Sequence, residues 1–82
     1  MDPADVAGTY VATDTPVLTL TAVQGGGFTM RLGNGLEYAA YPAGRQALYV
    51  PGLDFYLAFS GDKTDRAMHV KAQELNVVMR RS

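Results

Sequence analysis

Apolar and polar residues alternate through the C-terminal part of the chain. Over residues 53–59, large aliphatic and aromatic side chains occupy every second position, which is the period of a half-buried strand. Small, polar, turn-forming residues follow at 60–65, and the alternation resumes over 68–72. A second turn near Gln73 leads to a third alternating segment, 75–79. These patterns predict three consecutive strands, and because three strands with one exposed face are not stable alone, the rest of the chain has to complete their sheet.

The N-terminal part contains five further short segments of this kind. Between them, the three glycines at 25–27 permit the positive φ angles of a tight reversal, and the Asn-Gly pair at 34–35 is the strongest short signal for a hairpin. The expected strands are 8–13, 17–23, 28–32, 36–41, 47–50, 53–59, 68–72 and 75–79. Residues 1–5 precede this pattern and are expected to be a flexible lead-in.

Short antiparallel strands joined by short loops predict an all-β fold. Eight of them in an up-and-down meander are about the number that closes into a small barrel filled by its own side chains, and closure removes exposed edges. We expect one domain over residues 1–82, with no helix longer than about one turn because no segment shows a 3.6-residue apolar period. The same alternation also fits a two-layer sandwich or a five-stranded OB-type barrel.

Strand parity predicts which side chains form the core. The expected core is Leu18, Leu20, Phe28, Met30, Leu32, Leu36, Phe55, Leu57, Phe59, Val70, Leu75 and Val77. In the short strand 47–50, Leu48 and Val50 point inward. Tyr10 and Tyr38 also have inward parity, where a buried hydroxyl needs a hydrogen-bond partner.

Composition narrows the range of partners. Of the 82 residues, 48% are hydrophobic and 18% are charged, which is typical of a folded domain. The net charge of -1, with scattered basic residues, argues against nucleic acid or an anionic membrane as partner. The chain has no cysteine, no apolar run long enough to span a bilayer and no apolar segment of a signal peptide at its acidic N-terminus. None of these features indicates a compartment.

Several segments together resemble a known family. They are residues 8–10, residues 48–59 with the turn at 51–52, the hairpin at 62–66, and the ending at 77–81. These look like the small lipocalin-like β-barrel domain at the C-terminus of many serine β-lactamase-like and penicillin-binding-protein-like hydrolases. The resemblance covers nearly the whole chain, and it implies a noncatalytic domain accessory to a catalytic domain that this chain does not contain. In such a hydrolase, the domain would be periplasmic or secreted.

One short motif imitates the nucleophile motif of those hydrolases. Residues 60–63 match Ser-x-x-Lys, and 63–65 resemble Lys-Thr-Gly. In that chemistry the serine opens a buried helix, whereas Ser60 is expected at an exposed hairpin tip, and neither Ser-Asp-Asn nor Tyr-x-Asn occurs in the chain. We therefore interpret this segment as a turn, assign no catalytic residue, and expect no hydrolysis of β-lactams, peptides or esters.

Other chemical sites find little support in the sequence. A triad of Ser60, His69 and either Asp54 or Asp65 would require convergence at a site shielded from water, and His69 has outward parity. One histidine and scattered carboxylates provide no zinc site. The glycines at 25–27 lack the lysine and helix of a phosphate-binding loop. We expect no metal and no cofactor.

Three outward tyrosines suggest an interaction surface. Tyr41, Tyr49 and Tyr56 lie on three successive strands, with Ala39 and Ala58 expected as a low floor between them. Tyrosine is favoured at interfaces because it combines a large apolar area with a polar tip. The leading hypothesis is thus a noncatalytic accessory domain that packs through this face on a catalytic hydrolase domain or on a second copy of itself.

The alternative hypothesis is a small lipocalin-like barrel that binds an apolar ligand in its interior. The side chains expected to line that interior are Leu20, Phe28, Tyr38, Leu57 and Met79. Interior volume discriminates between the two hypotheses. Eight short strands with many large inward side chains are expected to leave little room.

Overall fold

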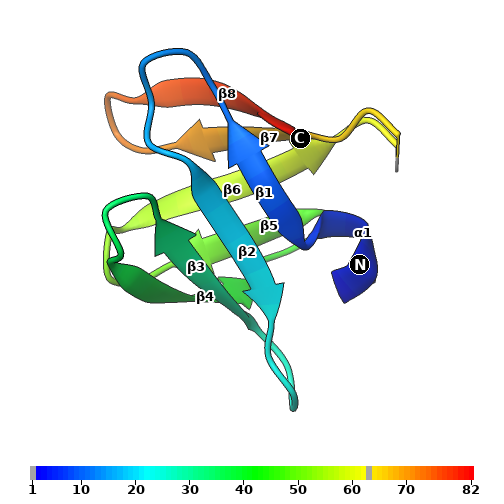
Figure 1. Ribbon diagram of the computed structural model, residues 1–82. Coiled ribbons are helices and arrows are strands. Elements are labelled where there is room, and N and C mark those ends of the chain that lie inside the picture. The colour runs from blue at the N-terminus through cyan, green and yellow to red at the C-terminus, as the bar shows by residue number, and fades with distance from the viewer. Residues whose placement is uncertain (1, 63) are drawn as a thin grey trace.

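The computed structural model describes residues 2–62 and 64–82 and shows a closed antiparallel β-barrel (Figure 1). Its elements are α1 (Pro3–Val6), β1 (Gly8–Val11), β2 (Leu18–Ala22), β3 (Phe28–Leu32), β4 (Glu37–Pro42), β5 (Ala47–Val50), β6 (Phe55–Ser60), β7 (Ala67–Lys71) and β8 (Asn76–Arg81). Each strand pairs with the next along the chain, and β8 pairs with β1. The predicted all-β meander of eight strands is confirmed, and the described helix has one turn of four residues.

Glycine-containing turns make the tight reversals between strands. Gly25, Gly26 and Gly27 all have positive φ angles (94°, 115° and 81°), and they connect β2 to β3. Gly35, at φ 92°, follows Asn34, whose side-chain Oδ1 accepts a hydrogen bond from the Leu36 amide at 3.0 Å. These are the reversals that the glycine run and the Asn-Gly pair predict, because glycine reaches positive φ without a steric penalty.

Most of the expected core is buried inside the barrel. Of the predicted residues, those that are buried are Leu18, Leu20, Phe28, Met30, Leu57, Phe59 and Val70, and those that are half-buried against the core are Leu32, Phe55 and Val77. The core also contains Val6, Tyr10, Ala40, Leu48, Val50, Met68 and Met79. The strand parity is therefore correct around the barrel.

Two residues that the sequence predicts to be in the core are exposed in the structure. Leu36 is 52% exposed and Leu75 is 47% exposed. Each precedes the first residue of its strand, β4 and β8 respectively, and so belongs to a turn at the end of the barrel. A similar shift affects residues 53–54, which form a turn with Asp54 at φ 53°, so that β6 begins only at Phe55. Strand alternation assigns a face only to residues that are within the sheet.

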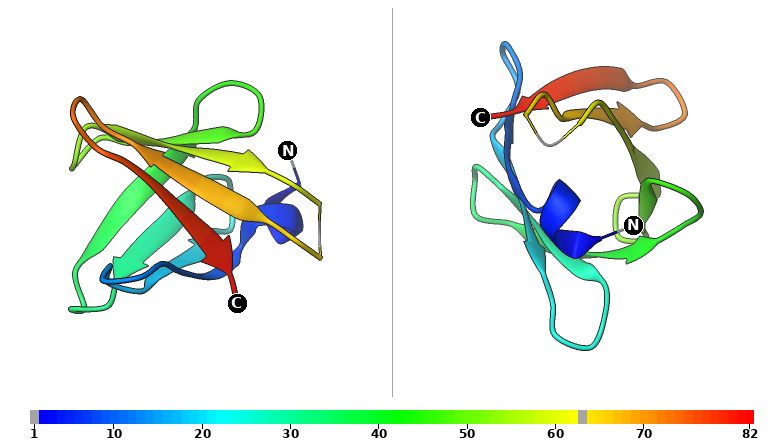
Figure 2. Two further views of the ribbon diagram at one scale, coloured as in Figure 1. Left: turned by 90° about the horizontal axis from the view of Figure 1, so that it is seen from above. Right: turned by 90° about the vertical axis from the view of Figure 1, so that its right-hand side faces the viewer.

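The N-terminal segment differs from the expected flexible lead-in. Pro3–Val6 forms α1, which lies across one end of the barrel (Figure 2). Asp2 caps this helix by accepting a hydrogen bond from the Ala4 amide at 3.0 Å, and proline is favourable at its start. Val6 is 1% exposed and closes this end with an apolar side chain. We call it the closed end; the open end carries the turns at 12–17, 33–36, 51–54 and 72–75.

Two arginines and one tyrosine hold α1 in place. Arg66 Nε donates to the Asp5 carbonyl at 3.1 Å, and Arg81 Nη1 donates to the same oxygen at 2.8 Å. The Tyr10 hydroxyl donates to the Val6 carbonyl at 2.7 Å, which supplies the partner that its inward position requires. Arg66 is only 8% exposed, but its charge is solvated by carbonyl oxygens because its Nη1 also donates to Gly61 at 2.8 Å.

The core assignment predicts unequal effects for two truncations in β6. Leu57→Ala removes a fully buried side chain and is expected to lower the free energy of unfolding by about 2–5 kcal/mol. Phe55→Ala is expected to cost less, since Phe55 is half-buried at the open end. Urea denaturation of both variants measures the two costs. Tolerance of Leu57→Ala would mean that the inward face of β6 is wrongly assigned.

The Tyr10 hydrogen bond predicts a pH-dependent contribution to stability. Burial raises the pKa of Tyr10 above its usual value, although Arg81 and Arg66 act in the opposite direction. Because the folded protein holds this proton more tightly than the unfolded chain, the contribution is complete below about pH 10 and is lost as the pH rises above that value. Tyr10→Phe should lower the unfolding free energy by about 1–3 kcal/mol at pH 7, since the buried Val6 carbonyl loses its donor. Denaturation of both proteins between pH 7 and 11 should show a steeper loss in the wild type; equal slopes would contradict this assignment.

Candidate interaction surface

The three outward tyrosines lie side by side on β4, β5 and β6. Tyr41 is directly opposite Tyr49, and Tyr49 is directly opposite Tyr56. Tyr41 and Tyr56 are 52% and 48% exposed, and the central Tyr49 is half-buried between them. We call this row the tyrosine strip. Its residues are those that strand parity places on one outer face.

Contacts with neighbouring groups fix the rings of the tyrosine strip. The rings of Tyr49 and Tyr56 have centroids 4.9 Å apart and are tilted by 44°. The Tyr49 hydroxyl donates to Asp54 Oδ1 at 2.7 Å, and this hydrogen bond is the main reason that the pKa of Tyr49 is raised. The ring of Tyr41 lies over Gly27, where an added Cβ would be 3.5 Å from it. Tyr49 thus has a hydrogen bond and a ring contact within the strip, while Tyr41 and Tyr56 keep about half of their surface exposed.

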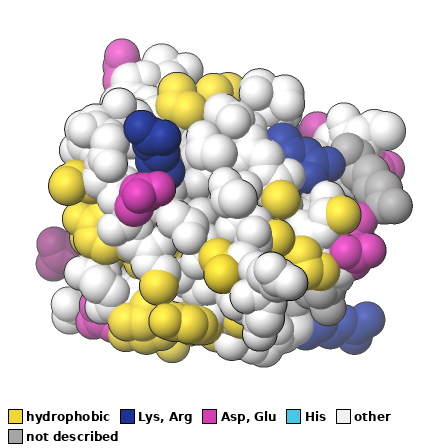
Figure 3. Space-filling model, turned by 60° about the horizontal axis from the view of Figure 1, so that its bottom comes forward, with side chains coloured by type: hydrophobic (Ala, Val, Ile, Leu, Met, Phe, Trp, Pro, Cys, Tyr) yellow, Lys and Arg dark blue, Asp and Glu magenta, His cyan; other side chains and the backbone are white. Residues whose placement is uncertain are grey.

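Small residues flank the tyrosine strip rather than lie between its rings. Ala39 is on β4, opposite Thr29, two residues nearer the open end than Tyr41. Ala58 is on the other side of the strip, opposite Ala47 on β5 and His69 on β7. The prediction that Ala39 and Ala58 form an apolar floor between the rings is therefore wrong, because the three tyrosines are paired directly with no residue between them. On the face seen in Figure 3, hydrophobic side chains form separate groups among polar and backbone atoms.

The side chains expected to line an interior ligand site are part of the packed core. Leu20, Phe28, Leu57 and Met79 are all buried within one cluster. Tyr38 is half-buried and its ring lies against Gly52, where an added Cβ would be only 2.8 Å away. Leu20, Phe28, Tyr38 and Leu57 thus fill the barrel interior, whereas Met79 also lines a pocket at the open end.

An apolar pocket of about 130 Å³ lies at the open end, and sequence reasoning did not find it. It is lined by Thr15, Pro16, Leu18, Leu32, Phe55, Val70, Leu75, Val77 and Met79. Parity indicates that most of these side chains point inward, but it does not show that they stop short of filling the last layer of the barrel. We call this feature the open-end pocket.

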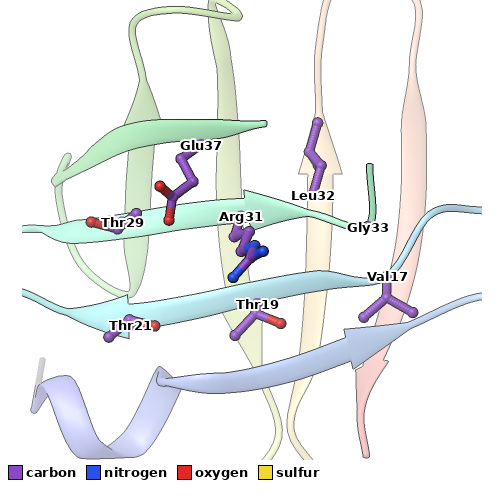
Figure 4. Close-up of a pocket in the computed structure, with 8 residues that line it drawn as sticks. All are labelled: Val17, Thr19, Thr21, Thr29, Arg31, Leu32, Gly33 and Glu37. Atoms are coloured by element: carbon purple, nitrogen blue, oxygen red, sulfur yellow. The ribbon is translucent and has the colours of Figure 1, made fainter. Parts of the chain in front are cut away.

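A larger and more polar hollow lies on the outer face of β2, β3 and β4 (Figure 4). It has a volume of about 530 Å³ and is lined by Val17, Thr19, Thr21, Thr29, Arg31, Leu32, Gly33 and Glu37. Arg31 is opposite Thr19 on β2 and Glu37 on β4, and its side chain extends towards Thr19. Outward parity predicts these polar side chains, whereas the sequence pattern does not predict a hollow between them.

The structure places Ser60 and His69 in contact but does not assemble a triad. Ser60 Oγ lies 3.3 Å from His69 Nε2, on the exposed outer face. Asp54 accepts a hydrogen bond from Tyr49, and Asp65 forms an ion pair with Arg80 at 3.2 Å. Both carboxylates are thus engaged away from the imidazole. Lys63 of the Ser-x-x-Lys match lies outside the described residues.

The hairpin between β6 and β7 is organised by Asp62. Its Oδ1 accepts hydrogen bonds from the Thr64 amide and hydroxyl at 2.9 and 2.7 Å and from the Asp65 amide at 3.1 Å. These hydrogen bonds, led by the one from the Thr64 hydroxyl, lower the pKa of Asp62. Side-chain hydrogen bonds of this kind are typical of Asx turns, so Asp62 has a structural role here.

Searches for a metal site and for a membrane-spanning helix give no candidate in the described part of the chain. Within residues 2–62 and 64–82, no group of three or more histidine or carboxylate side chains is placed to hold a metal ion. No helix in the same residues is long and apolar enough to cross a membrane.

Because the Ser60–His69 contact is exposed, we expect the replacement of Ser60 by alanine to have little effect on stability and no effect on hydrolysis rates. Ser60→Ala removes one exposed hydrogen bond, so the free energy of unfolding should change by no more than about 0.5 kcal/mol. The protein and the variant should show the same background rates with a chromogenic β-lactam and with a nitrophenyl ester. Turnover by the wild type that disappears in Ser60→Ala would establish a nucleophilic serine instead.

Comparison with known proteins adds no relative on which to base an assignment. Searches with protein-family models, among curated proteins and among solved structures found no match to this chain. The candidate surface therefore depends on the register of β4, β5 and β6 and on the contacts of their tyrosines.

Proposed function

We propose that this chain is a noncatalytic accessory barrel that docks through its tyrosine strip on the catalytic domain of a β-lactamase-like serine hydrolase. One observation carries the proposal: three outward tyrosines occupy directly paired positions on β4, β5 and β6. The resemblance of the chain to the C-terminal barrel of such hydrolases gives the class of partner. A second copy of the chain is the competing partner that the experiment has to distinguish.

The geometry of the tyrosine strip suits a docking role. Tyrosine buries a large area while its hydroxyl keeps a polar contact, and such residues carry much of the binding energy at interfaces. The hydrogen bond of Tyr49 to Asp54 and its ring contact with Tyr56 restrain these two rings in advance. Less conformational entropy is then lost on binding, which is the advantage of a preorganised surface. Lys71, opposite Tyr56 on β7, adds a positive charge at one edge of the strip.

The arrangement of Ser60, His69 and the two candidate carboxylates supports an accessory role. The Ser60–His69 pair is exposed to solvent, and the two candidate carboxylates, Asp54 and Asp65, are engaged with Tyr49 and Arg80. A nucleophilic serine needs an oriented base and a site that excludes water. The lipocalin-like alternative, with a ligand among Leu20 and its neighbours, finds less support because that interior is packed.

The docking proposal predicts that the tyrosine strip can be removed without unfolding the barrel. Replacing Tyr41, Tyr49 and Tyr56 together by Ser should abolish binding to a β-lactamase-like hydrolase domain from the same organism. The isolated variant should remain folded at the temperature of the titration, which circular dichroism checks, although its thermal midpoint should fall because Tyr49 is half-buried, packs on Tyr56 and donates to Asp54. Calorimetric titration measures binding, and sedimentation equilibrium of the chain alone measures self-association.

The matched control replaces three outward threonines, Thr19, Thr21 and Thr29, by Ser on the polar face of β2 and β3. This control should bind as the wild type does. If the wild type self-associates and only the tyrosine variant loses this self-association, the partner of the strip is a second copy of the chain and not the hydrolase domain. Docking through the strip would be refuted if the tyrosine variant associated as the wild type does. It would also be refuted if the wild type bound neither the hydrolase domain nor a second copy of the chain.

A further inference from the structure

We propose that the open-end pocket binds a small, neutral, apolar molecule of about the size of a benzene ring. The pocket lies at the end of the barrel opposite α1, and its lining residues include none of the tyrosines of the strip. The inference therefore does not depend on the docking proposal. It shares only Met79 with the interior ligand site expected from the sequence, whose other side chains belong to the core or pack against it.

The pocket is built as a buried floor with a half-buried rim. Leu18, Val70 and Met79 are buried and form the floor. Leu32, Phe55 and Val77 are half-buried around them and already pack against the core. On one side of the rim, Leu75 is largely exposed; on another, Thr15 and Pro16 of the loop between β1 and β2 complete the wall. A ligand seated here would contact side chains from β2, β3, β6, β7 and β8.

The closed end of the barrel accommodates an apolar group. There, Val6 of α1 inserts an apolar side chain over the core and becomes almost fully buried. At the open end, the floor residues are only 1–6% exposed, but the rim above them is partly open to solvent, and Leu75 is 47% exposed. The described side chains thus leave an apolar space within the rim, and a compact hydrocarbon group would fill it as Val6 fills the closed end.

The volume of the pocket limits the size of its ligand. At about 130 Å³ it is close to the engineered cavity of about 150 Å³ that binds benzene in another protein. An extended lipid chain needs far more space, and sites for drug-sized ligands span about 300–1,000 Å³. A single six-membered ring or a branched group of similar bulk matches the available space.

The lining also determines the charge of the ligand. Apart from Thr15, the pocket is lined by hydrocarbon side chains and the thioether of Met79. The Thr15 hydroxyl already donates to the Thr13 carbonyl at 3.1 Å. A charged ligand would lose its hydration without gaining an ionic partner, whereas a neutral apolar one gains from leaving water. The ligand is thus neutral, and burial alone holds it.

The test is a titration of the folded chain with benzene, followed through the methyl NMR signals of the floor residues Leu18, Val70 and Met79. Saturable shifts confined to these and the rim methyls are expected. Val77→Phe should fill the pocket and weaken benzene binding by at least about tenfold, because its ring occupies the same space. The control, Val78→Phe, changes the next residue of β8, which points outward and is 45% exposed; it should bind benzene as the wild type does.

A second variant keeps the test informative if Val77→Phe does not fold. Leu75→Phe enlarges an exposed turn residue at the rim and should also weaken benzene binding without unfolding the barrel. The absence of saturable shifts in the wild type, or equal affinity in the wild type, Val77→Phe and Leu75→Phe, would overturn the proposal. The variant with all three tyrosines of the strip replaced by Ser should still bind benzene, so the pocket and docking proposals fail independently.

Discussion

Closure of the sheet between β1 and β8 is the contact on which the rest of the structure depends. This seam has only two paired positions, as the pairing of β4 with β5 does, with Tyr10 opposite Arg81 and Val11 opposite Arg80. An isolated strand pair of this length contributes little, so further contacts reinforce it. The Ser82 amide donates to the Thr9 carbonyl at 2.9 Å, and the Arg81 side chain crosses to carbonyls of α1 and the following residue at 2.8 and 3.3 Å. The seam and the helix that closes the barrel thus stabilise each other through one arginine.

A small closed barrel leaves few choices for the side chains inside it. Every inward position of eight short strands competes for the same narrow interior, and large residues such as Met30, Leu57 and Met68 fill it. Function is consequently displaced to the surface and to the ends. The outer faces of neighbouring strands differ strongly in character, with aromatic rings across β4 to β6 and threonine hydroxyls across β2 and β3.

The barrel and the tyrosine strip could be predicted from the sequence because both follow from alternation. Once short turns make consecutive strands neighbours, parity alone places Tyr41, Tyr49 and Tyr56 on one face. The pattern wrongly places Leu36 and Leu75 in the core, because an apolar residue beside a strand continues the alternation even where the backbone has already turned. The open-end pocket could not be predicted, since it depends on how far side chains from five strands reach along the barrel axis. Pairing of Arg66 and Arg81 with α1 likewise joins residues about sixty or more positions apart, which no local pattern encodes.

The contacts of α1 and Ser82 place both chain ends at the closed end of the barrel. The backbone enters through α1 and leaves just after β8, and Ser82 is bonded to Thr9. A domain whose two connections emerge together can be joined to other polypeptides, or inserted within one, without threading a linker past its far side. The open end would then face away from any covalent neighbour, so that the same barrel could be fixed to a larger protein at one end while its other end stayed accessible to solutes.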